Sequence, residues 1–332
     1  METTSGSSKT PARSAPRGRV LGARAARLLV LGAGLALAIT SLQPAPARAV
    51  SPGPVRSAKA ATSGNPRMFT ILDVADRPIA RPSARPRIVS LAPALTEILY
   101  AIGAGGDLVA DSDYCDYPAA ASKLPHVGEL RTLRLERIVA LRPTLVVTAA
   151  GPRAIYMSVE HLTRAPVFVA EDGSVAAIVH NTEALGLLTG HQAQAQALIK
   201  RIRSHLAAVS DRASHEPHPT VFYMVWNDPL QTASPRSYLG ELIADAGGQN
   251  IAPVGPGFYP WMSWETLLVD KPEVVIGPAN LASAIRAAGK ELGARTAVLD
   301  DDIISRPGPR VVEAIDLLYR AIHGESPEPR KP

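Results

Sequence analysis

The sequence predicts an α/β protein built from two similar α/β lobes joined by a single long helix. Three observations predict this fold class. Short apolar runs rich in β-branched residues alternate with helical patterns, which is typical of βαβ units and a parallel or mixed sheet. The same order of elements occurs twice along the chain. A helical region longer than any other lies between the two occurrences.

The first 49 of the 332 residues have the three parts of a secretory signal peptide. An arginine-rich start precedes an apolar stretch at residues 28–42, and the segment ends in Ala47-Arg48-Ala49. The apolar stretch is shorter than the roughly 20 residues that span a bilayer. We therefore expect export and cleavage after Ala49, with an uncleaved membrane anchor as the alternative.

The excess of positive charge is confined to this leader. The chain has 35 lysines and arginines against 30 acidic residues, a net charge of +5, but the first 49 residues alone carry +6. The remaining chain is near neutral at −1, so the composition favours no nucleic-acid partner. Cys115 is the single cysteine, which excludes an intramolecular disulfide and a zinc site made of several cysteines.

Composition and pattern divide the rest of the chain into four segments. Residues 50–85 are rich in Pro, Ala, Ser and Arg, as in a linker, with a possible short edge strand at 68–74. The N-terminal lobe is predicted at 86–173, the connecting helices at 174–212 and the C-terminal lobe at 213–332.

Within the connecting region, two helices are predicted with a break between them. Residues 175–188 form an amphipathic pattern that Thr189-Gly190 interrupts. Residues 192–209 then form a second helix about 27 Å long at 1.5 Å per residue. A helix of that length between two α/β halves can act as a rigid strut.

The two halves share two matching segments in the same order. A proline, a helical pattern and a Gly-Gly pair occur at 93–106 and again at 235–248. A glutamate, a helix, a proline and an apolar strand occur at 135–147 and again at 264–276. This repeat predicts two lobes of similar topology with a cleft between them.

The sequence carries no motif that indicates an enzyme. It has no H-E-x-x-H, P-loop, G-x-S-x-G or C-x-x-C motif, and its eight histidines are scattered. We therefore predict neither catalysis nor a resident metal or cofactor. An enzyme that uses Asp116 with His126 is the alternative from another functional class.

Aromatic residues gather in three loops, at 113–118, 226–230 and 258–264, where two lobes would face a cleft. Aromatic walls suit a flat or bulky ligand. Phe258 and Trp264 are the aromatic residues of these loops expected in the core. The predicted ligand-binding residues are Tyr117, Tyr259, Trp226, Trp261 and Asp116.

Several motifs resemble periplasmic cobalamin- and iron-chelate-binding proteins of ABC importers. The motifs are Arg-Ile-Val-Ser-Leu-Ala-Pro at 87–93 with Thr-Glu-Ile-Leu at 96–99, Asp-Tyr-Pro at 116–118, the segment 135–143 and Asp228-Pro229. The resemblance covers residues 86 to 322, and the vitamin B12-binding members are the most similar in pattern. It implies a class III, helical-backbone binding protein in the periplasm.

The resemblance also implies roles for four residues. Tyr117 and Tyr259 match aromatic positions that touch the corrin ring. Glu136 and Glu265 match lobe-surface glutamates that dock onto arginines of a permease dimer in the inner membrane. These glutamates occupy equivalent places in the two repeats, so each lobe would present one carboxylate. The alternative is that each only stabilises a helix N-terminus, with Ser263 as the N-cap before Glu265.

The ligand implied by the resemblance is cobalamin or a related metal chelate, bound by a monomer. At positions where vitamin B12-binding members have further tryptophans, this chain has Leu130 and Ala149. Haem and ferric siderophores are therefore the alternatives. Haem would need an axial ligand such as Tyr117, Tyr259 or His126, whereas a siderophore site would use arginines, here Arg153 and Arg236.

Overall fold

The computed structural model describes residues 70–82, 85–255 and 257–324. The predicted signal peptide, its cleavage site and most of the predicted linker lie outside the described residues. None of the helices in the described ranges combines the length and the apolarity that a membrane span requires.

The N-terminal lobe contains a four-stranded parallel sheet with the order β4-β3-β5-β6. The strands β3 and β5 are wholly buried because helices cover the sheet, and their sequences are accordingly apolar runs. The elements are β3 Ile88–Ser90, α1 Pro93–Ala101, η1 Gly105–Asp107, β4 Leu108–Asp111, η2 Ala121–Lys123, α2 Leu135–Ala140, β5 Leu145–Thr148, α3 Arg153–Thr163 and β6 Val167–Val169.

The short strand predicted within 68–74 is present at residues 70–72, and it belongs to a small sheet of its own. Strand β1 (Thr70–Leu72) pairs antiparallel with β2 (Pro78–Ala80) in a separate two-stranded sheet. The Asp73 carboxylate stabilises the turn between β1 and β2. It accepts hydrogen bonds from the backbone N–H groups of Ala75 and Arg77, and it forms an ion pair with the Arg77 guanidinium.

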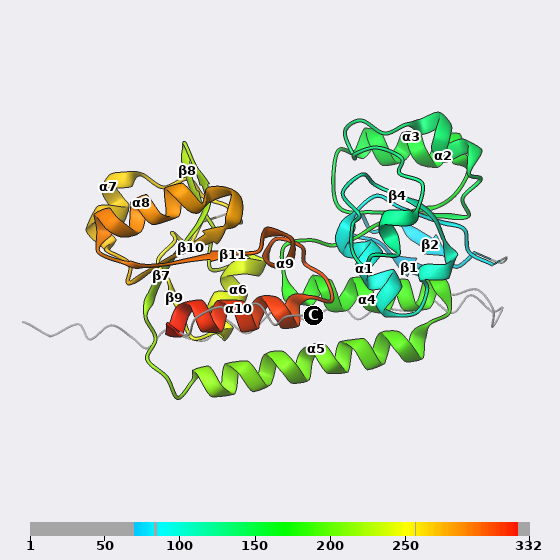
Figure 1. Cartoon of the computed structure of the whole chain (residues 1–332). Coiled ribbons are helices and arrows are strands. Elements are labelled where there is room, and N and C mark those ends of the chain that lie inside the picture. Colours follow the sequence, from blue (N-terminus) through cyan, green and yellow to red (C-terminus); the bar gives the residue numbers. More distant parts are fainter. Residues whose placement is uncertain (1–69, 83–84, 256, 325–332) are drawn as a thin grey trace, which may run out of the picture. The chain divides into compact units, whose positions relative to one another are not determined.

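Two helices connect the lobes, and their boundaries confirm the predicted break. Helix α4 (Val175–Thr189) begins at Ser174, whose hydroxyl accepts the N–H of Ala177 at 3.0 Å. It ends at Gly190, which adopts a φ of 85° that favours glycine. Helix α5 (Gln192–Ala213) follows with 22 residues, or about 33 Å. It runs beneath α4 and α10 (Val311–His323) (Figure 1).

The C-terminal lobe repeats the topology of the first. Its parallel strands have the order β9-β7-β10-β11, which corresponds to β4-β3-β5-β6, and β8 adds an antiparallel hairpin to β7. The predicted fold class of two similar α/β lobes is thus confirmed. The remaining elements are β7 Thr220–Asn227, β8 Leu230–Thr232, α6 Tyr238–Asp245, β9 Gln249–Asn250, α7 Trp264–Asp270, β10 Val274–Pro278, η3 Ala279–Leu281, α8 Ala282–Leu292, β11 Arg295–Leu299 and α9 Asp301–Ile304.

One buried apolar cluster connects both lobes to the linking helices. It includes Ile98 of α1, Leu185 of α4, Leu198 of α5, Leu242 of α6 and Leu318 of α10. Separate clusters fill the outer layers of each lobe. The core is therefore continuous where the lobes meet α4 and α5, which favours a fixed rather than a freely hinged arrangement.

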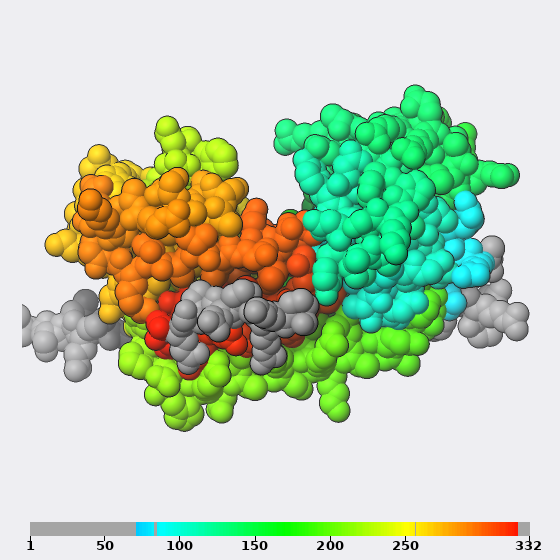
Figure 2. All heavy atoms as spheres, in the orientation of Figure 1, coloured from blue at the N-terminus to red at the C-terminus, as the bar shows by residue number. Residues whose placement is uncertain are grey.

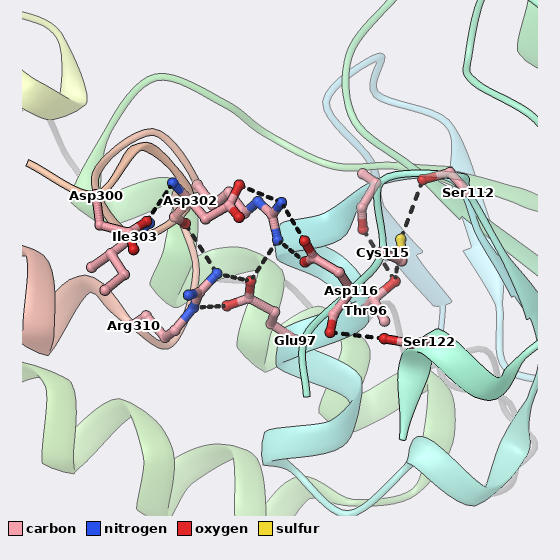
Figure 3. A network of polar contacts seen from close by, with 12 residues as sticks. Thr96, Glu97, Ser112, Cys115, Asp116, Ser122, Asp300, Asp302, Ile303 and Arg310 are labelled. Atoms are coloured by element: carbon pink, nitrogen blue, oxygen red, sulfur yellow. Dashed lines mark hydrogen bonds and ion pairs between the residues drawn. The ribbon is translucent and has the colours of Figure 1, made fainter. Parts of the chain in front are cut away.

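A buried ion pair joins the N-terminal lobe to the C-terminal helix (Figure 3). Arg310 precedes α10 and donates to both oxygens of Glu97 in α1, at 3.0 Å and 2.6 Å. Its guanidinium also donates to the carbonyl oxygen of Asp302 at 3.0 Å. Arg306 extends the network, because it pairs with Asp116 at 2.6 Å and with Asp302 at 2.5 Å.

The Glu97–Arg310 pair is almost wholly withdrawn from water, and burial raises the pKa of Glu97 even though both arginines favour its charged form. The pairing is bidentate, so each oxygen of the Glu97 carboxylate accepts a hydrogen bond from Arg310. Removing one partner would leave the other buried and uncompensated, which costs more than the intact pair contributes.

Glu97→Ala should lower the free energy of unfolding by about 3–5 kcal/mol, because Arg310 would remain buried without its carboxylate. Urea unfolding followed by circular dichroism measures this change. The matched control is Glu313→Ala at an exposed position of α10, which should change stability by less than about 0.5 kcal/mol. Equal stabilities for the two variants would contradict the role given to the pair.

Candidate functional site

A cavity of about 360 Å³ opens at the carboxyl ends of the parallel strands of the C-terminal lobe. Tyr223 and Trp226 of β7, Tyr238 of α6 and Tyr259 line it, and Asp172 borders it from the segment after β6. In the space-filling view, the surface is hollowed between the lobes on the side away from α5 (Figure 2). Ligands of open α/β sheets bind at this edge, because there the loops diverge. The cavity is therefore the leading candidate for a ligand site.

Backbone pairing holds Tyr259 at this cavity. The segment 258–262 runs antiparallel to the β8 region, with Ser234 donating to the carbonyl of Phe258 at 2.8 Å and Thr232 to that of Pro260 at 3.1 Å. The Gln231 side chain donates to the carbonyl of Tyr259 at 2.9 Å. These bonds fix the Tyr259 side chain, which is 43% exposed, at the edge of the cavity.

Trp226 forms a second aromatic surface of the cavity. Its indole N–H donates to the carbonyl oxygen of Asp228 at 2.9 Å, so the polar edge of the ring is already bonded. The side chain is 49% exposed. An aromatic face with its polar group satisfied locally suits contact with an apolar ligand surface.

Two buried tyrosines also border the cavity, and neither was among the predicted ligand-binding residues. Tyr223 and Tyr238 are 1% and 2% exposed, and neither hydroxyl has a hydrogen-bond partner among the described residues. Tyr223 lies in an apolar strand pattern and Tyr238 in an apolar helix pattern, so both read as core. The signal that could have identified these two tyrosines is the hydroxyl group, which is polar within an otherwise apolar pattern.

Tyr117 lies at a different cavity, of about 500 Å³, between α1, α5 and α10. The guanidinium carbon of Arg310 is 4.4 Å from the centre of the Tyr117 ring, which is a cation–π contact. Glu97 lines the same cavity. Tyr117 and Tyr259, predicted to touch one ligand, therefore line separate cavities in this structure.

The other predicted ligand residues take different positions. Asp116 is paired with Arg306, which lowers the pKa of its carboxyl group. Trp261 is exposed and forms an isolated β-bridge with Gln231, beside the segment that carries Tyr259. It is not among the residues that line either of these two cavities.

Asp116 and His126, the pair of the enzyme alternative, have separate partners. Nδ1 of His126 lies 2.7 Å from an oxygen of Asp111, whereas Asp116 pairs with Arg306. In the described part of the chain, no group of three or more His, Cys, Asp or Glu side chains is arranged to hold a metal ion. The Cys115 thiol is buried, and its sulfur lies 3.2 Å from the hydroxyl oxygen of Thr96 and 3.2 Å from that of Ser112.

The expectation that Phe258 belongs to the core is wrong. Its side chain is 47% exposed, and its ring lies against Gly173, where an added Cβ would be 2.7 Å from the ring. The absent side chain of Gly173 thus makes room for the ring at the surface. Trp264 is half-buried and packs against the outer core of the C-terminal lobe, while its indole N–H donates to Glu291 at 3.1 Å.

Glu136 and Glu265 are each the second residue of a short helix, α2 and α7, and both are exposed. The predicted N-cap is confirmed, since the Ser263 hydroxyl accepts the N–H of Thr266 at 3.1 Å. Hydrogen bonds from the backbone and from Ser263 lower the pKa of Glu265. Arg134 provides no such cap to α2. Both helices lie on the side of their lobes away from α5 (Figure 1).

The fold and the cavity together define a class of protein: a two-lobed α/β binding protein with a candidate ligand site at the carboxyl ends of parallel strands. A family model described as "Periplasmic binding protein" matches residues 88–316. The chain belongs to this family.

Individual relatives and solved structures agree with that family. The vitamin B12-binding protein of Yersinia pestis (strain Pestoides F) is 28% identical over 240 residues, which cover 71% of this chain and 85% of the relative. The crystal structure of the periplasmic vitamin B12-binding protein of Vibrio cholerae is 27% identical, with a TM-score of 0.64 over 73% of this chain and 98% of that one.

A haem-binding relative is similar to nearly the same degree. The apo form of the periplasmic heme-binding protein from Roseiflexus sp. RS-1 is 26% identical, with a TM-score of 0.63 over 72% of this chain and 100% of that one. Similarity alone therefore does not select one chelate over the other.

Asp111→Asn should flatten the dependence of stability on pH between about 4 and 6. Burial raises the pKa of Asp111 to about 6, although His126 opposes the shift. The folded state thus keeps a proton that the unfolded state has already lost, so this carboxyl group favours folding most below pH 4 and loses that contribution as the pH rises through 6. The loss in the wild type is on the order of 2–3 kcal/mol.

Urea unfolding at half-unit pH steps measures this effect. The control is Asp211→Asn at an exposed position of α5, which should leave the slope of the wild type unchanged. If the stability of Asp111→Asn depended on pH as steeply as that of the wild type, the pKa of Asp111 would be an ordinary one.

Proposed function

We propose that this protein is a periplasmic substrate-binding protein that captures cobalamin or a related metal chelate and delivers it to an ABC permease in the inner membrane. The observation that carries the proposal is the cavity flanked by Trp226 and Tyr259 at the carboxyl ends of the sheet in a chain of this family. The Yersinia pestis and Vibrio cholerae relatives are named vitamin B12-binding proteins, which makes cobalamin the first chelate to test.

The chemistry of the cavity suits one edge of a large, flat ligand. Trp226 and Tyr259 expose apolar ring area beside the cavity of about 360 Å³. A corrinoid would place part of its ring system there, with the rest outside the cavity. The Tyr259 hydroxyl would be neutral near pH 7, as tyrosine is in water, and burial and then Asp172 raise its pKa further.

Haem or a ferric siderophore is the second candidate ligand. The Roseiflexus relative is a heme-binding protein, and Tyr259 is an available tyrosine for an axial bond to iron. His126 is already paired with Asp111, so it is the weaker candidate for that bond. Catalysis by Asp116 with His126 has less support, since the two side chains have separate partners.

Titration of the mature protein with cyanocobalamin, haemin and ferric siderophores should give one-to-one binding, tightest for cyanocobalamin, measured by calorimetry and by quenching of tryptophan fluorescence. Trp226→Phe should remove most of the quenching, because this indole lines the cavity. The control Trp264→Phe should retain it, because that indole packs against the C-terminal core and bonds Glu291. Failure to bind any of the three chelates would refute the proposal.

For delivery, we propose that Glu136 and Glu265 contact arginines of a permease dimer. The support is their equivalence in the two repeats: each is exposed at the second position of a helix that precedes a core strand, β5 or β10. One carboxylate per lobe matches a partner with twofold symmetry, and paired charges would fix the orientation of docking. The binding protein itself would act as a monomer.

Glu136→Lys and Glu265→Lys should each lower ligand uptake at least tenfold in vesicles that contain the cognate permease, while leaving ligand affinity unchanged. The expected loss follows from reversing a charge that faces arginines. The control Asp270→Lys, at the last residue of α7, should transport normally. Normal uptake by both glutamate variants would show that they only stabilise their helices.

A further inference from the structure

Helices α2 and α7, which carry the two docking glutamates, also present similar apolar neighbours on the side of the lobes away from α5 (Figure 1). Val139 and Leu268 each lie three residues after the glutamate, one turn along the same helix, and are 38% and 37% exposed. Protein interfaces combine apolar and polar side chains in this way. The lobes thus present two matching faces, which we call the α2 face (residues 131–142) and the α7 face (residues 260–271).

The two faces differ in their positive charges. Arg131 and Arg137 of the α2 face are both exposed. When the two repeats are aligned at their glutamates, the matching residues of the α7 face are Pro260 and Thr266, which carry no charge. The α2 face therefore has two cations that have no counterpart on the α7 face.

These two cations are not neutralised within the described part of the chain. Arg134, which lies between them, pairs with Asp113 at 3.5 Å. Arg131 and Arg137 form no side-chain hydrogen bond or ion pair with any described residue. Water solvates such exposed charges, so they matter where a partner approaches, and Arg137 directly follows Glu136 in α2.

The charge next to each glutamate determines what a partner must present there. A partner arginine that reaches Glu136 would also come close to Arg137, and like charges brought together at an interface lower the affinity. A carboxylate beside the partner arginine would remove that repulsion. On the α7 face, Glu265 is followed by the neutral Thr266, whose hydroxyl lies 3.1 Å from that of Ser263. No additional carboxylate is needed opposite this face.

We propose that the permease has two non-identical halves, and that the half receiving the α2 face carries a carboxylate beside its arginine, so that Arg131 and Arg137 determine which lobe docks on which half. The inference rests on the proposed function, because it concerns the permease that receives the ligand. The glutamates and the exposed aliphatic side chains would make the contacts common to both halves. The two arginines would select one of the two orientations that similar lobes otherwise allow.

The test measures binding of the labelled mature protein to right-side-out inner-membrane vesicles of the source cell, which requires no ligand. Arg131→Glu and Arg137→Glu should each weaken binding about tenfold, whereas Arg137→Lys should stay within about twofold of the wild type. Thr266→Arg should also weaken binding about tenfold, because the half that receives the α7 face presents an arginine without a carboxylate. The control Arg203→Glu, at an exposed position of α5, should bind like the wild type.

The outcomes separate this inference from the proposed function. Unchanged binding by both arginine reversals would overturn the inference, and so would unchanged or tighter binding by Thr266→Arg, because the two halves would then present the same charges. Weaker binding by Glu136→Lys and Glu265→Lys in the same assay would leave the proposed docking intact. If those two variants also bound like the wild type, both proposals would fail.

Two further measurements identify what the arginines contact. Protein-free vesicles made from the same lipids should bind the wild type and the arginine reversals equally weakly. Binding to these vesicles that depends on the arginines would assign them to anionic lipid headgroups and would overturn the inference. Thermal melts of the variants should match that of the wild type, because the substituted side chains are exposed.

Discussion

The buried pairing of Glu97 with Arg310 constrains where the two lobes meet. Glu97 belongs to α1 of the first repeat, whereas Arg310 and Arg306 lie between α9 and α10 of the second. An unpaired carboxylate or guanidinium at this depth would be costly, so the segment 302–310 is held against α1. The cavity border at Asp301, Ser305 and Pro307 belongs to the same stretch of chain. The ion pair therefore also positions part of the candidate ligand site.

Helix α5 and the shared apolar cluster act together with this pair. The cluster joins α1, α4, α5, α6 and α10, so displacement of one lobe would expose apolar surface as well as break the ion pair. A stiff linker of this kind favours small lobe motion on ligand binding rather than wide hinge closure. Recognition would then depend on a preformed cavity.

Much of the fold could be predicted from the chain, because helix and strand patterns are local. Gly190 ended a helix through its positive φ, as the Thr189-Gly190 pair predicted, and the repeat at 93–106 and 235–248 reappeared as matching strand order. The candidate site was predicted less well. Tyr259 and Trp226 line the cavity, but Tyr117 stacks on Arg310 at another cavity, and Phe258 lies at the surface instead of in the core. Side-chain neighbours that are far apart in the sequence leave no local pattern.

The sequence by itself determined the class of fold, the two lobes and their helical link, because apolar periodicity and turn residues act over a few positions. It also determined that the excess of positive charge lies in the first 49 residues and that the rest of the chain is near neutral. Only the tertiary structure decided which aromatic residues share a cavity and which carboxylates are already paired. Those properties depend on burial and on contacts between distant segments, which exist only once both repeats have folded against each other.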